Sequence, residues 1–230
     1  MIRQIKKTIV QEEHKIKFWI KVVVAFVSIT IASYIAGSFH PNTWTTKKII
    51  KDTENQMVSE WNQFGFHKPS IEYSTDIEFI MAVGRCVDYL NLHHLHEERV
   101  HKYIIVAMAV LETGYGKSRF AKDANNLFGI RTWDENEPQL KPLELPDAEF
   151  GVKKYPTKCD SVEDMIDIIN RLPAYEDFRI ERELQLQSGK IDLDKQIELL
   201  SKWSTNPKYT ELVKSKGKSV ENILENKLAK

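Results

Sequence analysis

Residues 103–130 read YIIVAMAVLETGYGKSRFAKDANNLFGI, and this stretch decides the fold. Residues 104–111 are entirely apolar, which predicts a helix that is buried on most of its surface. We expect this helix to start near Glu97 and to end at Gly114 and Gly116, because glycine readily adopts the backbone angles of a helix stop. The stretch therefore predicts the central helix of a mainly helical domain.

A carboxylate, Glu112, lies near the end of this predicted helix. It follows Ile105, Met108 and Ala109 at the i, i+3, i+4, i+7 spacing of one helical face, so we expect it to be buried. Burial and the negative end of the helix dipole both disfavour the charged form and raise the pKa of the carboxyl group. A carboxylic acid that is protonated near neutral pH suits general acid catalysis of glycosidic bond cleavage. On these grounds alone, a solvated glutamate at a frayed helix end is the alternative.

The sequence on both sides of this stretch is also helical, with one interruption. Apolar residues recur at helical spacing from about Thr75. Between Leu127 and Tyr155 the helical pattern stops, and QLKPLEL and AEFGVKKY flank Pro146-Asp147, which predicts a small hairpin. The expected fold is α+β, predominantly α, with a small β-hairpin lobe. Further helices are expected from Asp160, which with Glu163 resembles a capping box, over 175–187 and 193–203, and after Pro207.

An apolar segment near the N-terminus predicts a transmembrane helix. Residues 22–39 carry no charge, and with 18–21 they match the ~30 Å hydrocarbon core of a bilayer. The positive-inside rule predicts 1–17 as a cytoplasmic basic tail, 18–39 as a single-pass signal anchor in the cytoplasmic (inner) membrane, and the folded domain on the periplasmic or extracellular side. A cleaved signal peptide and a buried core helix are the alternatives. The basic residues of the tail and its flank are Arg3, Lys6, Lys7, Lys15, Lys17 and Lys21.

The remaining chain predicts a tether followed by one domain. Residues 40–72 are polar and weakly patterned, which indicates a tether with a short packing helix, and 73–230 form the domain. Lys plus Arg equals Asp plus Glu at 33 each, and the folded part carries no basic stripe. A nucleic-acid partner is therefore not expected. The sequence predicts no oligomeric state.

Neither the cysteines nor the histidines predict a metal site. Cys86 and Cys159 lack metal-ligand spacing; two buried or free thiols are the favoured interpretation, and a disulfide in an oxidising compartment is the alternative. The segment NLHHLHEERVH contains HEERVH, which resembles the zinc-protease HExxH pattern with one residue too many. His96 and His101 are five positions apart and do not stack on one helical face. We therefore expect a solvated loop, and neither a metal nor an organic cofactor.

The segment LETGYGKSRFAKDANNLFGI resembles the signature of the glucosaminidase superfamily, glycoside hydrolase family seventy-three. Members typically read ESGWG and then NNLFG. Here Thr113 stands for the usual serine and Tyr115 for the usual tryptophan, and residues 125–129 match the second block fully. AEFGVKKYPTKCDSVED resembles a further family block, and AYEDFR and WSTNPKYTELV resemble later blocks of the Bax-type branch. The resemblance covers 77–213 and implies a lysozyme-like fold that hydrolyses the β-1,4 bond after N-acetylglucosamine in peptidoglycan glycan strands.

The resemblance also implies roles for individual residues. Glu112 becomes the general acid, and Tyr209 falls where the family places a tyrosine near the scissile bond. The implied substrate-binding residues are Tyr115, which would stack on sugar, Asn126 and Phe128, which would shape the cleft floor and hold its loop, and Tyr155.

Glycosidases usually need a second carboxylate besides the general acid, and we expect this partner of Glu112 in the β lobe. Glu144 is favoured there, because LKPLEL best resembles a strand facing the cleft; Glu135, Glu137 and Glu149 are the other candidates. In a substrate-assisted route the 2-acetamido group of the sugar would attack instead, and no enzymatic nucleophile would be needed.

Two other functions are compatible with the same pattern. A muramidase or lytic transglycosylase of this fold would cut the other glycan linkage. A non-catalytic, membrane-tethered wall-binding protein would use the scaffold without the chemistry. Wall remodelling, passage of a flagellum or secretion channel, and viral lysis would all employ the same reaction.

Overall fold

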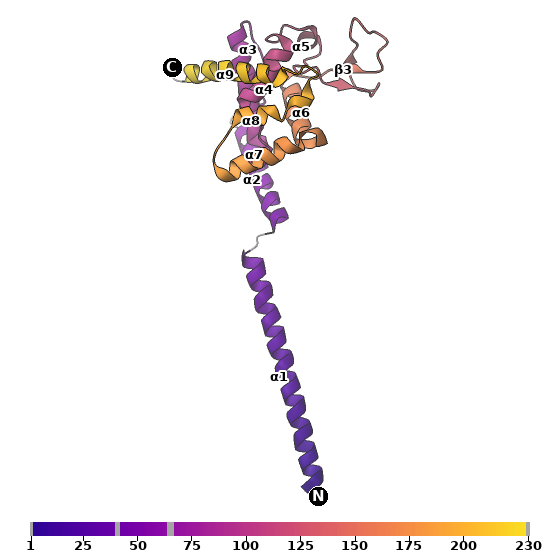
Figure 1. Ribbon diagram of the computed structural model, residues 1–230, viewed down its shortest axis with the longest axis vertical. Helices are drawn as coiled ribbons and strands as arrows, with labels where there is room; N and C mark the ends of the chain where they lie inside the picture. The colour runs from indigo at the N-terminus through magenta and orange to yellow at the C-terminus, as the bar shows by residue number, and fades with distance from the viewer. Residues whose placement is uncertain (1, 40–41, 64–66, 229–230) are drawn as a thin grey trace. The chain divides into compact units, whose positions relative to one another are not determined.

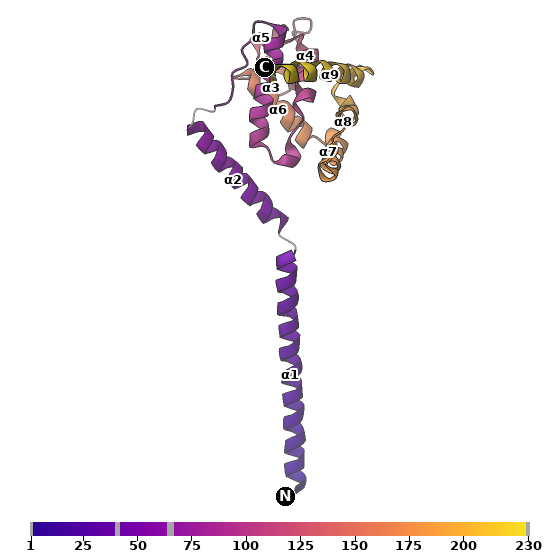
Figure 2. The same ribbon diagram turned by 90° about the vertical axis from the view of Figure 1, so that its left-hand side faces the viewer.

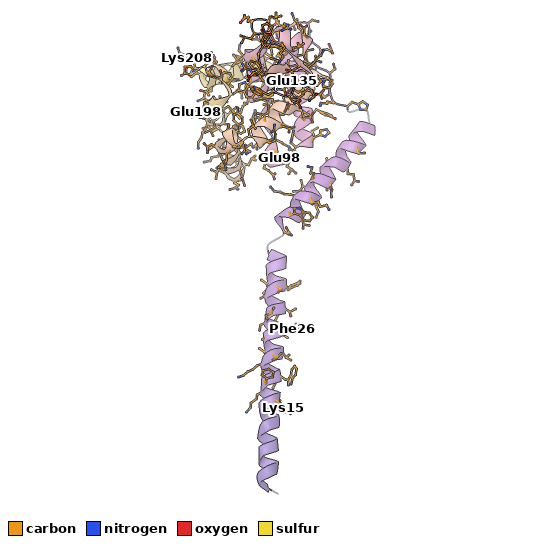
Figure 3. All side chains as sticks on the ribbon, turned by 90° about the vertical axis from the view of Figure 1, so that its right-hand side faces the viewer. Lys15, Phe26, Glu98, Glu135, Glu198 and Lys208 are labelled. Carbon is orange, nitrogen blue, oxygen red and sulfur yellow. A yellow bond between two sulfur atoms is a disulfide. The ribbon has the colours of Figure 1, made fainter. Side chains whose placement is uncertain are left out.

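The computed structural model describes residues 2–39, 42–63 and 67–228 (Figure 1). The chain divides into two units, residues 1–53 and 54–230, each described by itself. Helix α1, Ile2–Phe39, contains the apolar segment Lys15–Ile35, whose mean hydropathy is 2.0. All side chains of this segment are exposed, unlike those of a core helix; Phe26 is 72% exposed (Figure 3). The segment is long and apolar enough to cross a membrane, a property that signal sequences share.

Helix α2, Thr43–Gln63, is longer than the short packing helix that the sequence predicts. Its side chains are exposed wherever the structure describes them, so they give no evidence of packing. Phe64 and Phe66, two of the aromatic residues in this region, lie outside the described residues.

Helix α4, Lys102–Thr113, lies at the centre of the second unit, and residues 103–110 are all buried. It packs against α3, Asp76–His93, and against α9, Tyr209–Leu228, which runs crosswise to α3 in both views (Figure 1 and Figure 2). Helix α4 ends at Gly114, which has a φ of 57°, as predicted. The predicted start near Glu97 is wrong. Residues His96–Glu98 form the separate 3₁₀ turn η1, and His101 caps α4 by accepting a hydrogen bond from the Tyr103 backbone N–H.

The remaining helices follow the predicted order with shifted ends. Helix α6, Lys158–Arg171, starts before the predicted Asp160, because the Thr157 hydroxyl caps it and Asp160 occupies the third helical position of that capping box. The region predicted as one helix over 193–203 divides into α8 and η3. The other elements are α5, Arg119–Asp123; η2, Pro173–Tyr175; α7, Glu176–Ser188; α8, Leu193–Glu198; and η3, Ser201–Trp203.

A small antiparallel sheet interrupts the helices, as predicted, and projects to one side of them (Figure 1). Strands β2, Gln139–Leu140, and β3, Gly151–Lys153, form the expected hairpin, and β1, Arg131–Thr132, adds a third strand on the other edge of β3. The predicted strand through Glu144 is wrong: Glu144 lies in an exposed turn. Pro142 and Pro146 surround that turn and lack the N–H groups that a ladder needs.

Cys86 of α3 and Cys159 of α6 form a disulfide, and both residues are fully buried. The favoured interpretation as two thiols is therefore wrong, and the alternative pairing of the two cysteines is confirmed. The pairing depends on α3 packing against α6, a contact between residues 73 positions apart that no local pattern reveals.

Candidate active site

An open cleft of about 780 Å³ lies where the end of α4 meets the β lobe and η3. Its walls are mainly apolar and aromatic, and Arg131 is the basic residue in the lining. Among the described residues that line it, Glu112 carries the one carboxylate. A cleft of this size with few polar groups suits a sugar chain, which presents apolar ring faces and many hydroxyls. The aromatic lining residues are Phe120, Phe128, Trp133, Phe150 and Trp203.

Glu112 lies on the last turn of α4, with its side chain open to the cleft. The expected burial of Glu112 is wrong: Ile105, Met108 and Ala109 on the same helical face are fully buried, whereas Glu112 is exposed at the cleft. The indole Nε1–H of Trp203 donates a hydrogen bond of 3.1 Å to Glu112 Oε1. The surrounding protein displaces water from the carboxyl group and raises the pKa of Glu112, against the opposite effects of Tyr209 and Trp203. The direction expected for a general acid is therefore present, although the group is reachable from solvent.

Tyr209, the first residue of α9, lies beside Glu112. Its side chain is buried, and the hydroxyl has no partner at hydrogen-bonding distance and angle among the described atoms. The two groups are near enough to shift each other's pKa: burial first, and then the negative charge of Glu112, raise the pKa of Tyr209. The structure thus brings together the two residues that the sequence predicts at the reacting bond.

Asn126 holds the loop below the cleft through both the nitrogen and the oxygen of its side-chain amide. Its Nδ2 donates to the backbone oxygens of Ile130 and Lys153 at 2.9 and 2.8 Å. Its Oδ1 accepts from the backbone N–H groups of Phe128 and Ile130, both at 3.1 Å. Phe128 lines the cleft although it is only 2% exposed. These contacts fit the predicted loop-holding part of the two residues; Asn126 has little capacity left to bind sugar.

Tyr115 and Tyr155 lie outside the lining of the cleft. The Tyr115 hydroxyl accepts a hydrogen bond of 3.2 Å from Lys216 Nζ, and its ring packs edge-on against Phe79. Tyr155 is buried, and its hydroxyl donates to Asp164 Oδ2 at 2.6 Å. Burial and this carboxylate raise the pKa of Tyr155. The structure therefore gives both tyrosines packing contacts rather than positions in the cleft wall.

None of the four candidate partner carboxylates lines the cleft. Glu144, Glu135 and Glu149 are exposed. Glu137 pairs with Lys153 at 2.8 Å, and this contact lowers the pKa of Glu137. The structure thus places one carboxylate, and not a pair, in the described lining.

The sequence reasoning gave no site role to several cleft residues, among them Phe120, Arg131, Trp133, Phe150 and Trp203. The Arg131 guanidinium lies 4.3 Å from the ring centroid of Phe150, and the Trp133 and Phe150 rings are 6.1 Å apart. Trp133 is 66% exposed, an arrangement that suits a sugar-stacking surface. For Trp133 and Phe150 the available signal was an aromatic side chain within the interrupted region 127–155; for Trp203 it was its place in the WSTNPKYTELV block.

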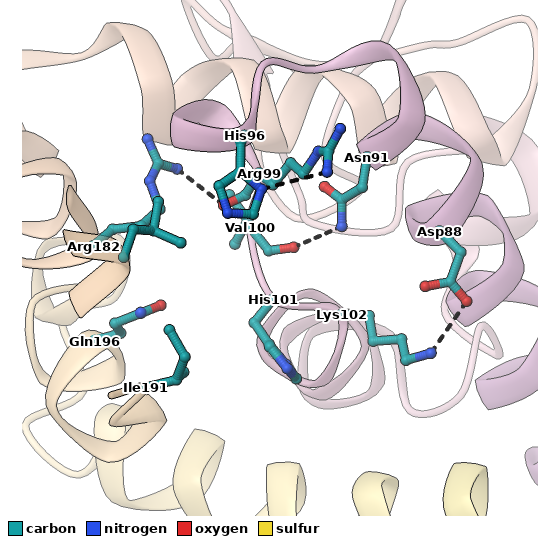
Figure 4. Close-up of a pocket in the computed structure, with 11 residues that line it drawn as sticks. Asp88, Asn91, His96, Arg99, Val100, His101, Lys102, Arg182, Ile191 and Gln196 are labelled. Carbon is teal, nitrogen blue, oxygen red and sulfur yellow. Dashed lines mark hydrogen bonds and ion pairs between the residues drawn. The ribbon is translucent and has the colours of Figure 1, made fainter. Parts of the chain in front are cut away.

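A second cavity, of about 250 Å³, lies at the opposite end of α4 (Figure 4). His96 and His101 line it with Asn91, whose Nδ2 donates to the Val100 backbone oxygen at 3.1 Å. Burial lowers the pKa of His101. Within residues 2–39, 42–63 and 67–228, no three His, Cys, Asp or Glu side chains are grouped as metal ligands would be. The carboxylate in its lining, Asp88, pairs with Lys102 Nζ at 3.2 Å.

Two curated proteins are similar to parts of the chain. Protein bax of Escherichia coli is 28% identical over 122 residues, which cover 53% of this chain and 39% of that protein. An N-acetylmuramoyl-L-alanine amidase domain-containing protein of Staphylococcus aureus is 28% identical over 100 residues, 40% of this chain and 15% of that protein. The chain thus spans well under half the length of either relative.

Two solved structures and one family model are also similar to this chain. The catalytic domain of the autolysin Auto from Listeria monocytogenes superposes with a TM-score of 0.50 at 19% identity, covering 72% of this chain and 96% of that one. The glycoside hydrolase domain of Salmonella typhimurium FlgJ has a TM-score of 0.49 at 15% identity, covering 66% and 92%. The glucosaminidase family model, described as mannosyl-glycoprotein endo-beta-N-acetylglucosaminidase, matches residues 92–222. With more than half of its length matched, and with Glu112 in the cleft of that part, this chain belongs to the glucosaminidase family.

Proposed function

We propose that this chain is a peptidoglycan hydrolase that cleaves the β-1,4 bond after N-acetylglucosamine, with Glu112 as its general acid. The observation that carries the proposal is the Glu112 carboxyl group, which has a raised pKa and opens into an aromatic cleft. Membership of the glucosaminidase family supports the type of bond. The fold shared with a listerial autolysin supports cell wall as the substrate.

The first test replaces Glu112 by glutamine. Glutamine keeps the shape of the side chain but has no acidic proton, and general acid catalysis contributes about 10²- to 10⁴-fold to rate. We expect Glu112→Gln to fold normally and to release soluble fragments from purified cell walls at least about 100-fold more slowly. Glu183→Gln, at an exposed position of α7 outside the cleft lining, is the matched control, and we expect it to retain activity. Undiminished activity in folded Glu112→Gln refutes the assignment.

The bond that is cut is read from the products. Mass spectrometry of digested cell wall is expected to find N-acetylglucosamine at the new reducing ends. Muramic acid or anhydro-muramic acid there would identify a muramidase or a lytic transglycosylase. Binding to cell walls without release of fragments over a broad pH range would identify a wall-binding protein.

For the nucleophile, the single carboxylate in the described lining supports the substrate-assisted route. The acetamido oxygen bonds to C1 while the C1–O bond breaks, and the leaving oxygen takes the proton of Glu112. Water then attacks C1, gives its proton to the Glu112 carboxylate and restores the acetamido group. Glu144 as nucleophile is the other route. Glu144→Gln leaves activity within about threefold in the first route and abolishes it in the second.

We place the catalytic domain outside the cytoplasm, anchored by residues 18–39. The apolar segment of α1 with basic residues before it supports this topology. The buried Cys86–Cys159 disulfide supports an oxidising compartment. The test is protease treatment of intact spheroplasts, which is expected to digest the domain while a tag at the N-terminus stays protected. N-terminal sequencing of the mature protein distinguishes an anchor from a cleaved signal peptide.

A further inference from the structure

We propose that Trp203 is a positioning residue that keeps the acidic proton of Glu112 on Oε2, the carboxyl oxygen left for the substrate. The inference rests on the proposed function, because it concerns how Glu112 presents its proton. The observation is the hydrogen bond of 3.1 Å between the Trp203 indole N–H and Glu112 Oε1.

The chemistry of indole makes this bond directional. The Nε1–H group of tryptophan donates a hydrogen bond and cannot accept one. Glu112 Oε1 therefore has to be the acceptor in the carboxylate and in the neutral acid alike. In a neutral carboxyl group the carbonyl oxygen accepts more strongly than the hydroxyl oxygen, so the Trp203 bond favours the proton on Oε2. A tyrosine or serine at position 203 would lack this selectivity, because a hydroxyl group donates and accepts.

Packing of the ring and the backbone around Trp203 hold the indole in place. Trp203 is partly buried and packs against the hydrophobic core. The two residues before it are exposed, and Leu200, which precedes those two, is fully buried. After Trp203 the chain turns: Asn206 N–H donates to Ser204 Oγ at 3.2 Å, and Tyr209 N–H donates to the Asn206 backbone oxygen at 3.0 Å. A fixed ring keeps its N–H direction through the reaction, so little reorganisation is needed when Glu112 ionises.

The Tyr209 hydroxyl lies near the Glu112 carboxyl group and, like Trp203, lowers the pKa of Glu112. This buried hydroxyl has no partner at hydrogen-bonding distance and angle, although it lies near Glu112. In the part of the chain that the structure describes, Trp203 is the side chain that donates to Glu112 at such a distance. Oε1 is thus the oxygen that a described side chain engages at such a distance, and in our proposal Oε2 faces the glycosidic oxygen.

The bond has a second consequence for Glu112. A donated hydrogen bond stabilises the carboxylate more than the neutral acid, so the Trp203 contact lowers the pKa of Glu112 against the larger, raising effect of lost hydration. Removing the N–H is therefore expected to raise this pKa further. A purely structural role of Trp203 predicts no such change.

The kinetic experiment compares Trp203→Phe with Trp133→Phe in the full chain, solubilised in detergent, on soluble uncrosslinked glycan strands. Each variant loses one indole N–H from the cleft, but only Trp203 is bonded to Glu112. For Trp203→Phe we expect the alkaline limb of kcat/KM to move upward by about half to one pH unit. We also expect kcat to fall about twofold, because the proton then distributes over both oxygens. For Trp133→Phe we expect a higher KM and an unmoved alkaline limb.

A second measurement does not depend on activity. In ¹⁵N-labelled protein, the indole resonance that disappears in Trp203→Phe is expected to shift with pH at the midpoint of Glu112 ionisation, and to be flat in Glu112→Gln. An indole resonance that ignores pH, or an alkaline limb equally placed in wild type and Trp203→Phe, overturns the role of Trp203. Full activity of Glu112→Gln instead overturns the proposed function, so the two failures are distinguishable.

Discussion

The Cys86–Cys159 disulfide gives the sharpest quantitative prediction. It joins α3 to α6 across 73 positions of sequence, and both residues are fully buried. Without this bond, the unfolded chain gains the conformational freedom of the opened loop. In the loop-entropy treatment, a loop of 73 residues corresponds to about 4.4 kcal/mol of stabilisation at 25 °C. Because domains are typically stable by only about 5–15 kcal/mol, this bond is expected to supply a large share of the total.

The assay is urea unfolding followed by tryptophan fluorescence and far-ultraviolet circular dichroism. Oxidised protein is compared with protein that has been unfolded, reduced and refolded with reductant present. This comparison isolates the cross-link, since both forms contain the same sulfur atoms. The free energy of unfolding is expected to fall by about 4 kcal/mol on reduction.

Cys86→Ala/Cys159→Ala is the control variant. Its free energy of unfolding is expected to lie at or slightly below that of the reduced wild type, because two buried sulfur atoms are also lost. Reductant is expected to leave it unchanged. A loss below about 1 kcal/mol on reduction of the wild type, with two thiols detected per reduced chain, would refute the loop-entropy reasoning.

Two further predictions concern the segment around Glu112. Gly116 has a φ of +74°, and a Cβ there would lie 2.1 Å from Tyr73 Oη, so Gly116→Ala is expected to destabilise the domain by about 3 kcal/mol or more in urea unfolding. Gly114→Ala, with a φ of +57° and open space around the Cβ, should lose only about 1 kcal/mol, and equal losses would contradict the steric argument. Because the pKa of Glu112 is raised in the folded domain, the free energy of unfolding depends on pH. The contribution of protonated Glu112 to stability is fully present below the pKa of the unfolded state and is lost as pH rises through the higher pKa of the folded state. Glu112→Gln should therefore be more stable than wild type at pH 8 but not at pH 4. A difference in thermal melting temperature between the two proteins that stays constant across this range would contradict the prediction.

The sequence predicted the elements that depend on neighbouring residues. The apolar run before Glu112 makes α4 helical and buried, and Gly114 ends it because its backbone adopts a positive φ. The hairpin of β2 and β3 follows from turn residues between two short arms. The motifs around Glu112 and residues 125–129 indicated the family, and the match over residues 92–222 bears this out. The ends of helices were less predictable, because several neighbouring residues can cap a helix. Thr157 caps α6, whereas the sequence favoured Asp160.

The contacts between distant segments were decided only by the tertiary structure. Helical spacing indicated that Glu112 would be buried, but its side chain opens into the cleft, and the surrounding walls raise the pKa of Glu112. Trp203 meets Glu112 across 91 positions, and Cys86 meets Cys159 across 73. Such pairs form because whole helices pack their apolar faces together, and that packing sets which polar atoms come within bonding distance. The sequence by itself predicted the main helices, the hairpin and the candidate acid Glu112, whereas the hydrogen-bond donor to Glu112, the cleft wall and the cross-link arise from packing, which no local pattern encodes.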